Sequence, residues 1–327
     1  YNTEQPKRSH GITHVHHFYT KRNIWVLASF FKKLTSSIEI RLLLLLLTSS
    51  LIRTTKMYKF TIDRKMGTVS GTLYIPSILT ENGSLKLLRN KLLNFCRVSF
   101  TINKCVLIET TSVSDSSVPN GFIDYIFTDP PFGGNLMYSE LNFLWEAWLK
   151  VFTNNQPEAI MNDSQRKGLG EYKDLMTACF KEMYRILKPN RWMTVVFHNS
   201  RASVWNAIQD AITRAGFIIA QVTVLDKQQG SFKQVTSSGA VKNDLVINAY
   251  KPQQHLDEHF LKRVGEGLEK DFVQDLLEHL PIEPNIGRTE QMLFSKLLAY
   301  YVQRGYEIRL NARQFYTLLR DNFKLID

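Results

Sequence analysis

The sequence predicts an α/β fold, because strand-like and helix-like segments alternate along its middle. Residues 123–128, 192–197 and 217–225 are short apolar runs rich in β-branched and aromatic side chains, as expected of buried strands. Residues 171–187 and 202–214, which separate them, have apolar side chains at helical spacing. Strands that alternate with amphipathic helices indicate a largely parallel sheet covered by helices.

The first of these strands stops abruptly at Asp129-Pro130-Pro131-Phe132, which two glycines follow. Ligands in open α/β sheets bind outside the carboxyl ends of the strands, so the Asp129 side chain is expected to project into a crevice. Each proline fixes φ and lacks an N–H, which stiffens the turn and leaves the Pro130 carbonyl without a ladder partner. The carboxylate and the carbonyl can accept the two N–H bonds of a nucleobase amine while the base stacks on Phe132.

This pattern resembles the catalytic motif of S-adenosylmethionine-dependent amino-methyltransferases that act on adenine N6 or cytosine N4 of DNA. Four such residues also occur in ordinary turns after strands. The longer run from Thr128 to Trp148 is more specific. It resembles the adenine-specific DNA methylases that carry a zinc ribbon, over most of the chain. Cys96, Cys105 and Cys179 have no Cys-x-x-Cys spacing, so the ribbon itself is missing and no metal is expected.

The resemblance implies a partial Rossmann-like class I methyltransferase sheet that ends in an antiparallel hairpin of residues 217–225 and 244–250. It also implies site-specific transfer of a methyl group from S-adenosylmethionine to a flipped DNA base, with adenine N6 favoured over cytosine N4. The catalytic residues are then Asp129, Pro130, Pro131 and Phe132. The residues expected to bind substrate are Gly133, Asn135, Tyr138, Asn199 and Lys233, and Thr128 and Asp129 are expected to contact the cofactor.

The strand of residues 192–197 also ends in polar residues, His198-Asn199-Ser200. This repeats the arrangement at Asp129 and places His198 and Asn199 at the same crevice edge. Alternatively, Asn199 or Ser200 caps the helix that follows, and this interpretation is favoured for Ser200. Residues 154–170 are polar and are predicted to form a mobile loop over the site.

The cofactor site of this fold normally includes a glycine-rich turn after the first strand. Gly265-Glu266-Gly267 has no strand before it, and Gly168-Leu169-Gly170 lies in the polar loop, so neither fits. The main glycine-rich site and the first strands are therefore expected upstream of Tyr1. The sheet of this chain is expected to be partial, with an exposed edge.

Positive charge is concentrated in the N-terminal third. The 327 residues carry a net charge of +11, and residues 1–104 hold 17 Lys and Arg against 4 Asp and Glu, whereas the remainder holds 24 against 26. Clustered positive charge suits a phosphate backbone. Residues 1–95 are therefore predicted to be a basic insertion that contacts DNA, built of helices and a hairpin over residues 58–78. A solvated basic face without a partner is the alternative.

Two further segments complete the predicted organisation. Residues 96–252 are expected to form the catalytic domain, with a short buried strand at residues 106–108. Residues 253–327 are expected to form a helical, winged-helix-like accessory domain, with helices at 255–280 and 289–304, a short strand at 307–310 and a final helix capped by Asn311.

The N-terminal region also bears on targeting. Its start lacks the order of a signal peptide. The leucine-rich stretch of residues 42–52 is well short of the ~20 residues that cross a membrane, so a buried helix is expected, with a membrane segment as the alternative. The three cysteines lack the spacing of a disulfide framework, so a reducing cytoplasm is the expected compartment. His10, His14, His16 and His17 lack metal-ligand spacing and are expected to line a polar loop or to contact phosphate.

Three alternatives to a DNA methyltransferase remain at this point. They are a non-catalytic DNA-binding remnant, an RNA methyltransferase, and a protein-glutamine methyltransferase that uses a related motif. The sequence indicates neither a recognition site nor a restriction or phage-defence partner.

Overall fold

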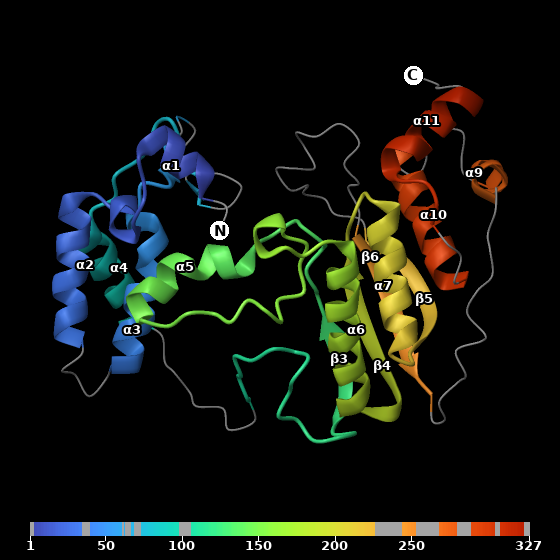
Figure 1. Cartoon of the computed structure of the whole chain (residues 1–327), viewed down its shortest axis with the longest axis horizontal. Coiled ribbons are helices and arrows are strands. Elements are labelled where there is room, and N and C mark those ends of the chain that lie inside the picture. The colour runs from blue at the N-terminus through green and yellow to red at the C-terminus, as the bar shows by residue number, and fades with distance from the viewer. Residues whose placement is uncertain are drawn as a thin grey trace. The chain divides into compact units, whose positions relative to one another are not determined.

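The computed structural model describes residues 3–34, 40–60, 62, 67–68, 73–97, 106–225, 244–252, 268–279, 289–304 and 308–323. The predictions for Lys233, Cys105 and Gly265-Glu266-Gly267 lie outside these residues. The chain forms two compact units (Figure 1). Unit 1 comprises Tyr1–Glu109 and Leu136–Gln156, and unit 2 comprises Thr110–Asn135 and Pro157–Asp327.

Unit 2 is built on a four-stranded mixed sheet. Its first two strands are parallel, and the other two neighbouring pairs are antiparallel, so the predicted terminal hairpin is confirmed. The strand order in the sheet is β3-β4-β6-β5. The strands are β3 (Ile123–Thr128), β4 (Leu187–Phe197), β5 (Ile218–Leu225) and β6 (Asp244–Lys251).

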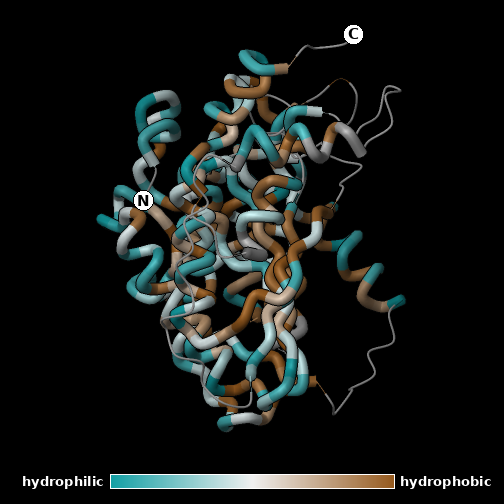
Figure 2. Tube along the Cα trace, turned by 90° about the vertical axis from the view of Figure 1, so that its right-hand side faces the viewer, coloured by the Kyte–Doolittle hydropathy of each residue, from teal (hydrophilic) through white to brown (hydrophobic). Residues whose placement is uncertain are grey.

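Two helices, α6 (Leu169–Ile186) and α7 (Ala202–Arg214), lie side by side against one face of this sheet (Figure 1). Alternate residues of β4, namely Met193, Val195 and Phe197, point to this face and are fully buried. The residues that pair with them on β6 are apolar as well. Directly paired residues of neighbouring strands point to the same face of the sheet, so both strands present apolar side chains to the helices. Figure 2 shows hydrophobic and hydrophilic residues alternating along the helices, as amphipathic packing requires.

The expectation that residues 123–128 form a buried strand is wrong. β3 is the edge strand of the described sheet, and Tyr125 and Phe127 are 53% and 64% exposed. They lie on the face opposite the helices, where Tyr125 Oη donates a hydrogen bond of 2.7 Å to Thr194 Oγ1. The apolar composition that predicted burial therefore reflects one covered face and one open face.

The helix α6 also ends earlier than predicted. It stops at Ile186, and Pro189 lies inside β4 instead of terminating the helix. Ile123 of β3 pairs with residue 187 of β4, and Tyr125 pairs with residue 192. Asp124 therefore lies opposite four residues of β4, which form a bulge. A bulge tolerates proline because no ladder N–H is needed there. Lys188 and Arg191 in this bulge pair with Asp124 at 2.8 and 3.4 Å.

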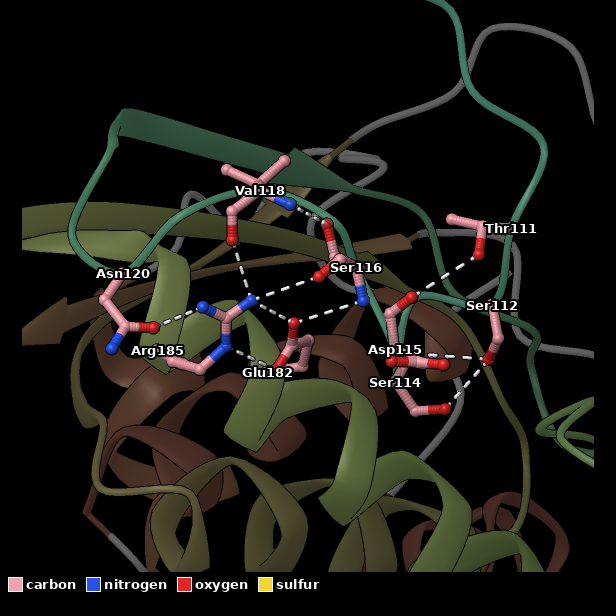
Figure 3. A network of polar contacts seen from close by, with 9 residues as sticks. All are labelled: Thr111, Ser112, Ser114, Asp115, Ser116, Val118, Asn120, Glu182 and Arg185. Atoms are coloured by element: carbon pink, nitrogen blue, oxygen red, sulfur yellow. Dashed lines mark hydrogen bonds and ion pairs between the residues drawn. The ribbon is translucent and has the colours of Figure 1, made fainter.

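A polar network fastens the segment before β3 to the end of α6 (Figure 3). Arg185 donates hydrogen bonds to the carbonyls of Ser116 (3.2 Å) and Val118 (2.8 Å) and to the side chain of Asn120. It also pairs with Glu182 at 2.5 Å, and Glu182 accepts a hydrogen bond of 3.1 Å from the Ser116 N–H. The pairing with Arg185 lowers the pKa of Glu182.

Arg185→Met is therefore expected to lower the free energy of unfolding at pH 7, because it removes charged hydrogen bonds to backbone carbonyls. A carboxylate with a lowered pKa stabilises the fold above its unfolded pKa and loses that effect as pH falls through the folded value. The difference between variant and wild type should therefore shrink below about pH 4. Denaturant unfolding at several pH values measures this. Arg214→Met, which breaks an exposed pair with Asp210, is the control and should cost less than about 1 kcal/mol.

In the described part of the C-terminal region, unit 2 contains the helices α9 (Leu268–His279), α10 (Glu290–Arg304) and α11 (Ala312–Asn322). Their apolar side chains join the same core as α7. The predicted cap is confirmed, since Asn311 Oδ1 accepts a hydrogen bond of 3.0 Å from Gln314 N. Residues 308–310 form no strand, because the Asn206 side chain takes both backbone hydrogen bonds of Ile308 at 2.7 Å.

Unit 1 consists of helices around a second core. The predicted helices and the hairpin are confirmed, although each strand of the hairpin has two residues. Residues 106–108 are exposed and form no strand, contrary to the expectation. No helix in the described ranges is long and apolar enough to cross a membrane. The elements are α1 (Glu4–His10), η1 (Val15–Phe18), α2 (Lys21–Leu34), α3 (Ile40–Leu51), η2 (Ile52–Thr54), β1 (Tyr58–Lys59), β2 (Gly67–Thr68), α4 (Ser84–Arg97) and α5 (Tyr138–Leu149).

The helix after the Asp129 motif, α5, packs within unit 1. Leu144 is 1% exposed in its core. Trp145 Nε1 donates a hydrogen bond of 2.9 Å to the Thr48 carbonyl, and Trp148 Nε1 donates one of 3.1 Å to Tyr19 Oη. Both tryptophans of this helix therefore contribute to the packing of unit 1.

Candidate active site

The site begins where β3 ends. Because β3 and β4 are parallel and Thr128 pairs with Val195, their carboxyl ends lie at one edge of the sheet. Asp129 follows Thr128 at this edge and is exposed. His198 and Asn199 follow β4 there, so the predicted meeting of the two strand ends is confirmed.

The Pro131 carbonyl is held by a buried tyrosine. Tyr172 on α6 is fully buried, and its hydroxyl donates a hydrogen bond of 2.7 Å to the Pro131 carbonyl. The Gly133 N–H donates a second bond of 3.0 Å to the same oxygen. Burial raises the pKa of Tyr172 well above the usual value, so the hydroxyl remains a donor throughout the physiological pH range.

The next two carbonyls of the turn are held as well. Asn199 Nδ2 donates a hydrogen bond of 3.0 Å to the Phe132 carbonyl, and the Met161 N–H donates one of 3.1 Å to the Gly133 carbonyl. Met161 belongs to the segment predicted to be a mobile loop. Part of that segment, from Asn162 to Lys167, closes in a turn through two backbone hydrogen bonds.

By contrast, none of the described residues donates a hydrogen bond to the Pro130 carbonyl. Three consecutive carbonyls of the turn are therefore satisfied by the protein, while the one next to Asp129 retains its capacity to accept. The sequence predicts that this carbonyl and the Asp129 carboxylate act together as acceptors, and that role stays a prediction.

The two glycines make this turn possible. Gly133 has φ +71°, in the left-handed region that disfavours side chains. A Cβ on Gly134 would lie 3.1 Å from the Met161 carbonyl oxygen. Glycine is therefore required for the backbone of the turn to approach the segment around Met161 closely.

Phe132 packs against the end of β4. Its ring lies edge-on to Phe197, with centroids 5.2 Å apart, and 6.1 Å from the ring of His198. Phe132 remains half-buried, so part of the ring surface is exposed. His198 Nδ1 lies 3.4 Å from Asp244 Oδ1 at the start of β6, and these two side chains are 13% and 4% exposed.

The remaining predicted site residues are less well placed. Tyr138 begins α5 in unit 1, whereas the turn after Asp129 lies in unit 2. Asn135 is exposed at the end of the unit 2 segment. Ser200 does not cap α7; Arg201 occupies the N-cap position and Asn199 Oδ1 accepts its N–H at 2.8 Å. Among the described residues, no group of three His, Cys, Asp or Glu side chains has the geometry to hold a metal.

Sequence reasoning missed Tyr172. Its position in α6 carries a signal, since it falls on the apolar stripe with Met176, Cys179 and Met183, where a hydroxyl needs a partner. The identity of that partner, a carbonyl 41 residues earlier in the chain, depends on the packing of α6 on the sheet.

Comparison with known proteins agrees with this geometry. A family model described as DNA methylase, of the N6/N4 class, matches residues 123–290, slightly more than half of the chain. The chain belongs to this DNA methylase family. The predicted resemblance to DNA amino-methyltransferases is therefore confirmed. No curated protein matches the chain.

Solved structures of methyltransferases also resemble the chain in part. One, described as a DNA modification methylase from Thermus thermophilus complexed with S-adenosyl-L-methionine, is 16% identical over 47% of this chain and 56% of that chain, with a TM-score of 0.25. A SAM-dependent methyltransferase from Methanosarcina mazei is 11% identical over 52% of this chain and 78% of that chain, with a TM-score of 0.27. The chain covers between 53% and 58% of the length of the Thermus structures.

Proposed function

We propose that this chain carries the catalytic and base-binding part of a DNA methyltransferase that modifies the exocyclic amine of a flipped base, adenine N6 in preference to cytosine N4. One observation carries the proposal. The Pro131, Phe132 and Gly133 carbonyls are hydrogen-bonded within the protein, whereas the Pro130 carbonyl beside Asp129 receives no hydrogen bond from the described residues.

A flipped base would be held by stacking and by two hydrogen bonds. Extruding the base costs a few kcal/mol, and stacking on the exposed part of the Phe132 ring returns about 1–3 kcal/mol. Asp129 and the Pro130 carbonyl then accept the two amine hydrogens. This draws the amine nitrogen toward tetrahedral geometry and directs its lone pair away from the ring. The protein contributes position and electrostatics, and no covalent enzyme intermediate is needed.

S-adenosylmethionine would supply the electrophilic methyl group when bound. Thr128 and Asp129 fit one edge of such a site, because both lie at the carboxyl end of β3 and offer oxygen acceptors to hydroxyl and amine donors. After transfer, the Asp129 carboxylate would accept the proton that the methylated amine releases.

Several finer features belong to the same proposal. Gly133, Asn135 and Asn199 are proposed to line the base site, with Asn199 acting through the Phe132 carbonyl. We place the enzyme in the cytoplasm, and its free cysteines Cys96 and Cys179 suit a reducing compartment. We also propose that the enzyme belongs to a restriction-modification system.

Expression of the chain in a methylation-deficient bacterium tests the activity without knowledge of the recognition site. Genomic DNA would be digested to nucleosides and analysed by mass spectrometry, with Asp129→Ala as the control. We expect N6-methyladenine above the level of the control. N4-methylcytosine would reverse the base preference. Neither product, together with no S-adenosylmethionine binding by calorimetry, would contradict activity of this chain and favour the non-catalytic DNA-binding alternative.

A further inference from the structure

The outer face of α2 in unit 1 combines an exposed tryptophan with cationic side chains. Trp25 is 75% exposed, whereas Leu27 and Leu34 on the opposite side of the helix are buried in the core of the unit. Arg22 and Lys32 are exposed and lie three residues before and seven after Trp25. At helical spacing these three side chains lie along one stripe.

Trp25 plays no part in the packing of unit 1. It is absent from the core and from the apolar side chains that pack on it, although neighbouring Ile24, Phe30 and Phe31 belong to that set. Burying a side chain of this size would gain at least about 1.5–3 kcal/mol. Among the other tryptophans, Trp192 is 43% exposed and Trp205 is 1% exposed. The large aromatic surface of Trp25 is thus available to a partner.

The charge around Trp25 indicates the kind of partner. The helices α2 and α4 pack against each other and together contain eight Lys and Arg and no Asp or Glu. One acidic side chain, Glu81, is bound next to the start of α2. It accepts a hydrogen bond of 2.8 Å from the hydroxyl of Thr20, the residue before the helix. Arg22 and Lys32 are separated by ten residues of helix, which corresponds to about 15 Å along the axis. A linear polyanion can therefore contact cations on both sides of the tryptophan.

We propose that this face of α2 binds single-stranded nucleic acid, with a base stacked on Trp25 and the flanking phosphates on Arg22 and Lys32. A groove or stripe of positive charge interrupted by an aromatic side chain is how proteins bind unpaired strands without reading their sequence. Double-stranded DNA keeps its bases stacked inside the helix and can use the cations alone. The face lies outside residues 123–290, so the proposal goes beyond methyl transfer and does not rest on it.

The test compares a fluorescently labelled oligothymidylate with a duplex of the same length, by anisotropy titration of the whole chain. Trp25→Ala should weaken oligothymidylate binding about 5- to 150-fold, the range for one stacked base, and duplex binding less than twofold. Trp25→Phe should restore most of the affinity. Trp192→Phe is the matched control, because Trp192 is the other strongly exposed tryptophan and lies in unit 2.

The salt dependence separates the two kinds of contact. Arg22→Gln should reduce the slope of log affinity against log salt by about 0.7, the value for one phosphate of a single strand, whereas Trp25→Ala should leave the slope unchanged. The proposal would be overturned if Trp25→Ala bound oligothymidylate as tightly as wild type does. It would also be overturned if Trp25→Ala lost as much affinity for the duplex as for oligothymidylate. Loss of methylation in Asp129→Ala bears on the proposed function alone, because Asp129 belongs to unit 2 and α2 belongs to unit 1.

Discussion

Asp129→Ala is expected to reduce methyl transfer at least about 100-fold while DNA binding remains close to that of wild type. The substitution removes one of the two acceptors for the amine hydrogens, and loss of a single preorganised hydrogen-bonding group at a reacting centre typically costs about 10²–10³ in turnover. Because Asp129 is exposed, its removal should change the free energy of unfolding by less than about 0.5 kcal/mol. Single-turnover methylation and anisotropy with the same DNA measure the two effects.

Two further variants distinguish charge from geometry at this position. Asp129→Asn keeps an acceptor oxygen at the end of β3 but removes the charge, so it should retain more activity than Asp129→Ala. Asp124→Ala removes an exposed carboxylate near the other end of the same strand, which pairs with Lys188 and Arg191, and should leave turnover unchanged. Full activity of Asp129→Ala would exclude the proposed role of the carboxylate.

Tyr172→Phe is expected to lower both stability and turnover. The variant keeps the ring in the core but leaves one bond fewer to the Pro131 carbonyl, which should cost about 1–3 kcal/mol of unfolding free energy. Removing this hydrogen bond also allows the turn that positions Asp129 and the Pro130 carbonyl to move. Because a displacement of about 1 Å can cost up to 10²-fold in rate, we expect kcat to fall about tenfold or more. Thermal unfolding and steady-state kinetics measure the two losses.

A purely structural role for Tyr172 would lower stability without a selective effect on kcat. Tyr250→Phe is the matched control, because its hydroxyl donates a hydrogen bond of the same length, 2.7 Å, to Asn190 in the bulge of β4. Asn190 lies in unit 2 but away from the carboxyl edge of the sheet. If Tyr250→Phe lowered kcat as much as Tyr172→Phe, the proposed positioning role would be wrong.

Much of unit 2 is predictable from local sequence. The limits of α7 agree with the predicted residues, and those of β3, β5 and β6 agree to within a residue, because their hydrophobic patterns have one clear period. The Asn311 cap is predictable for a similar reason, since capping involves a residue three positions away. The bulge at Pro189 is not, because a proline also ends helices and the local sequence does not distinguish the two outcomes.

The sequence by itself determined the α/β class, the Asp-Pro-Pro-Phe turn and the position of that turn at the end of a strand. These features depend on side-chain periodicity and on backbone limits that act within a few residues. Tertiary structure alone decided that β3 is an edge strand with Phe127 exposed, and that Tyr172 and Asn199 hold the carbonyls of the turn. Burial and hydrogen-bond partners between distant segments depend on how elements pack, and the same apolar strand or buried hydroxyl is compatible with several packings.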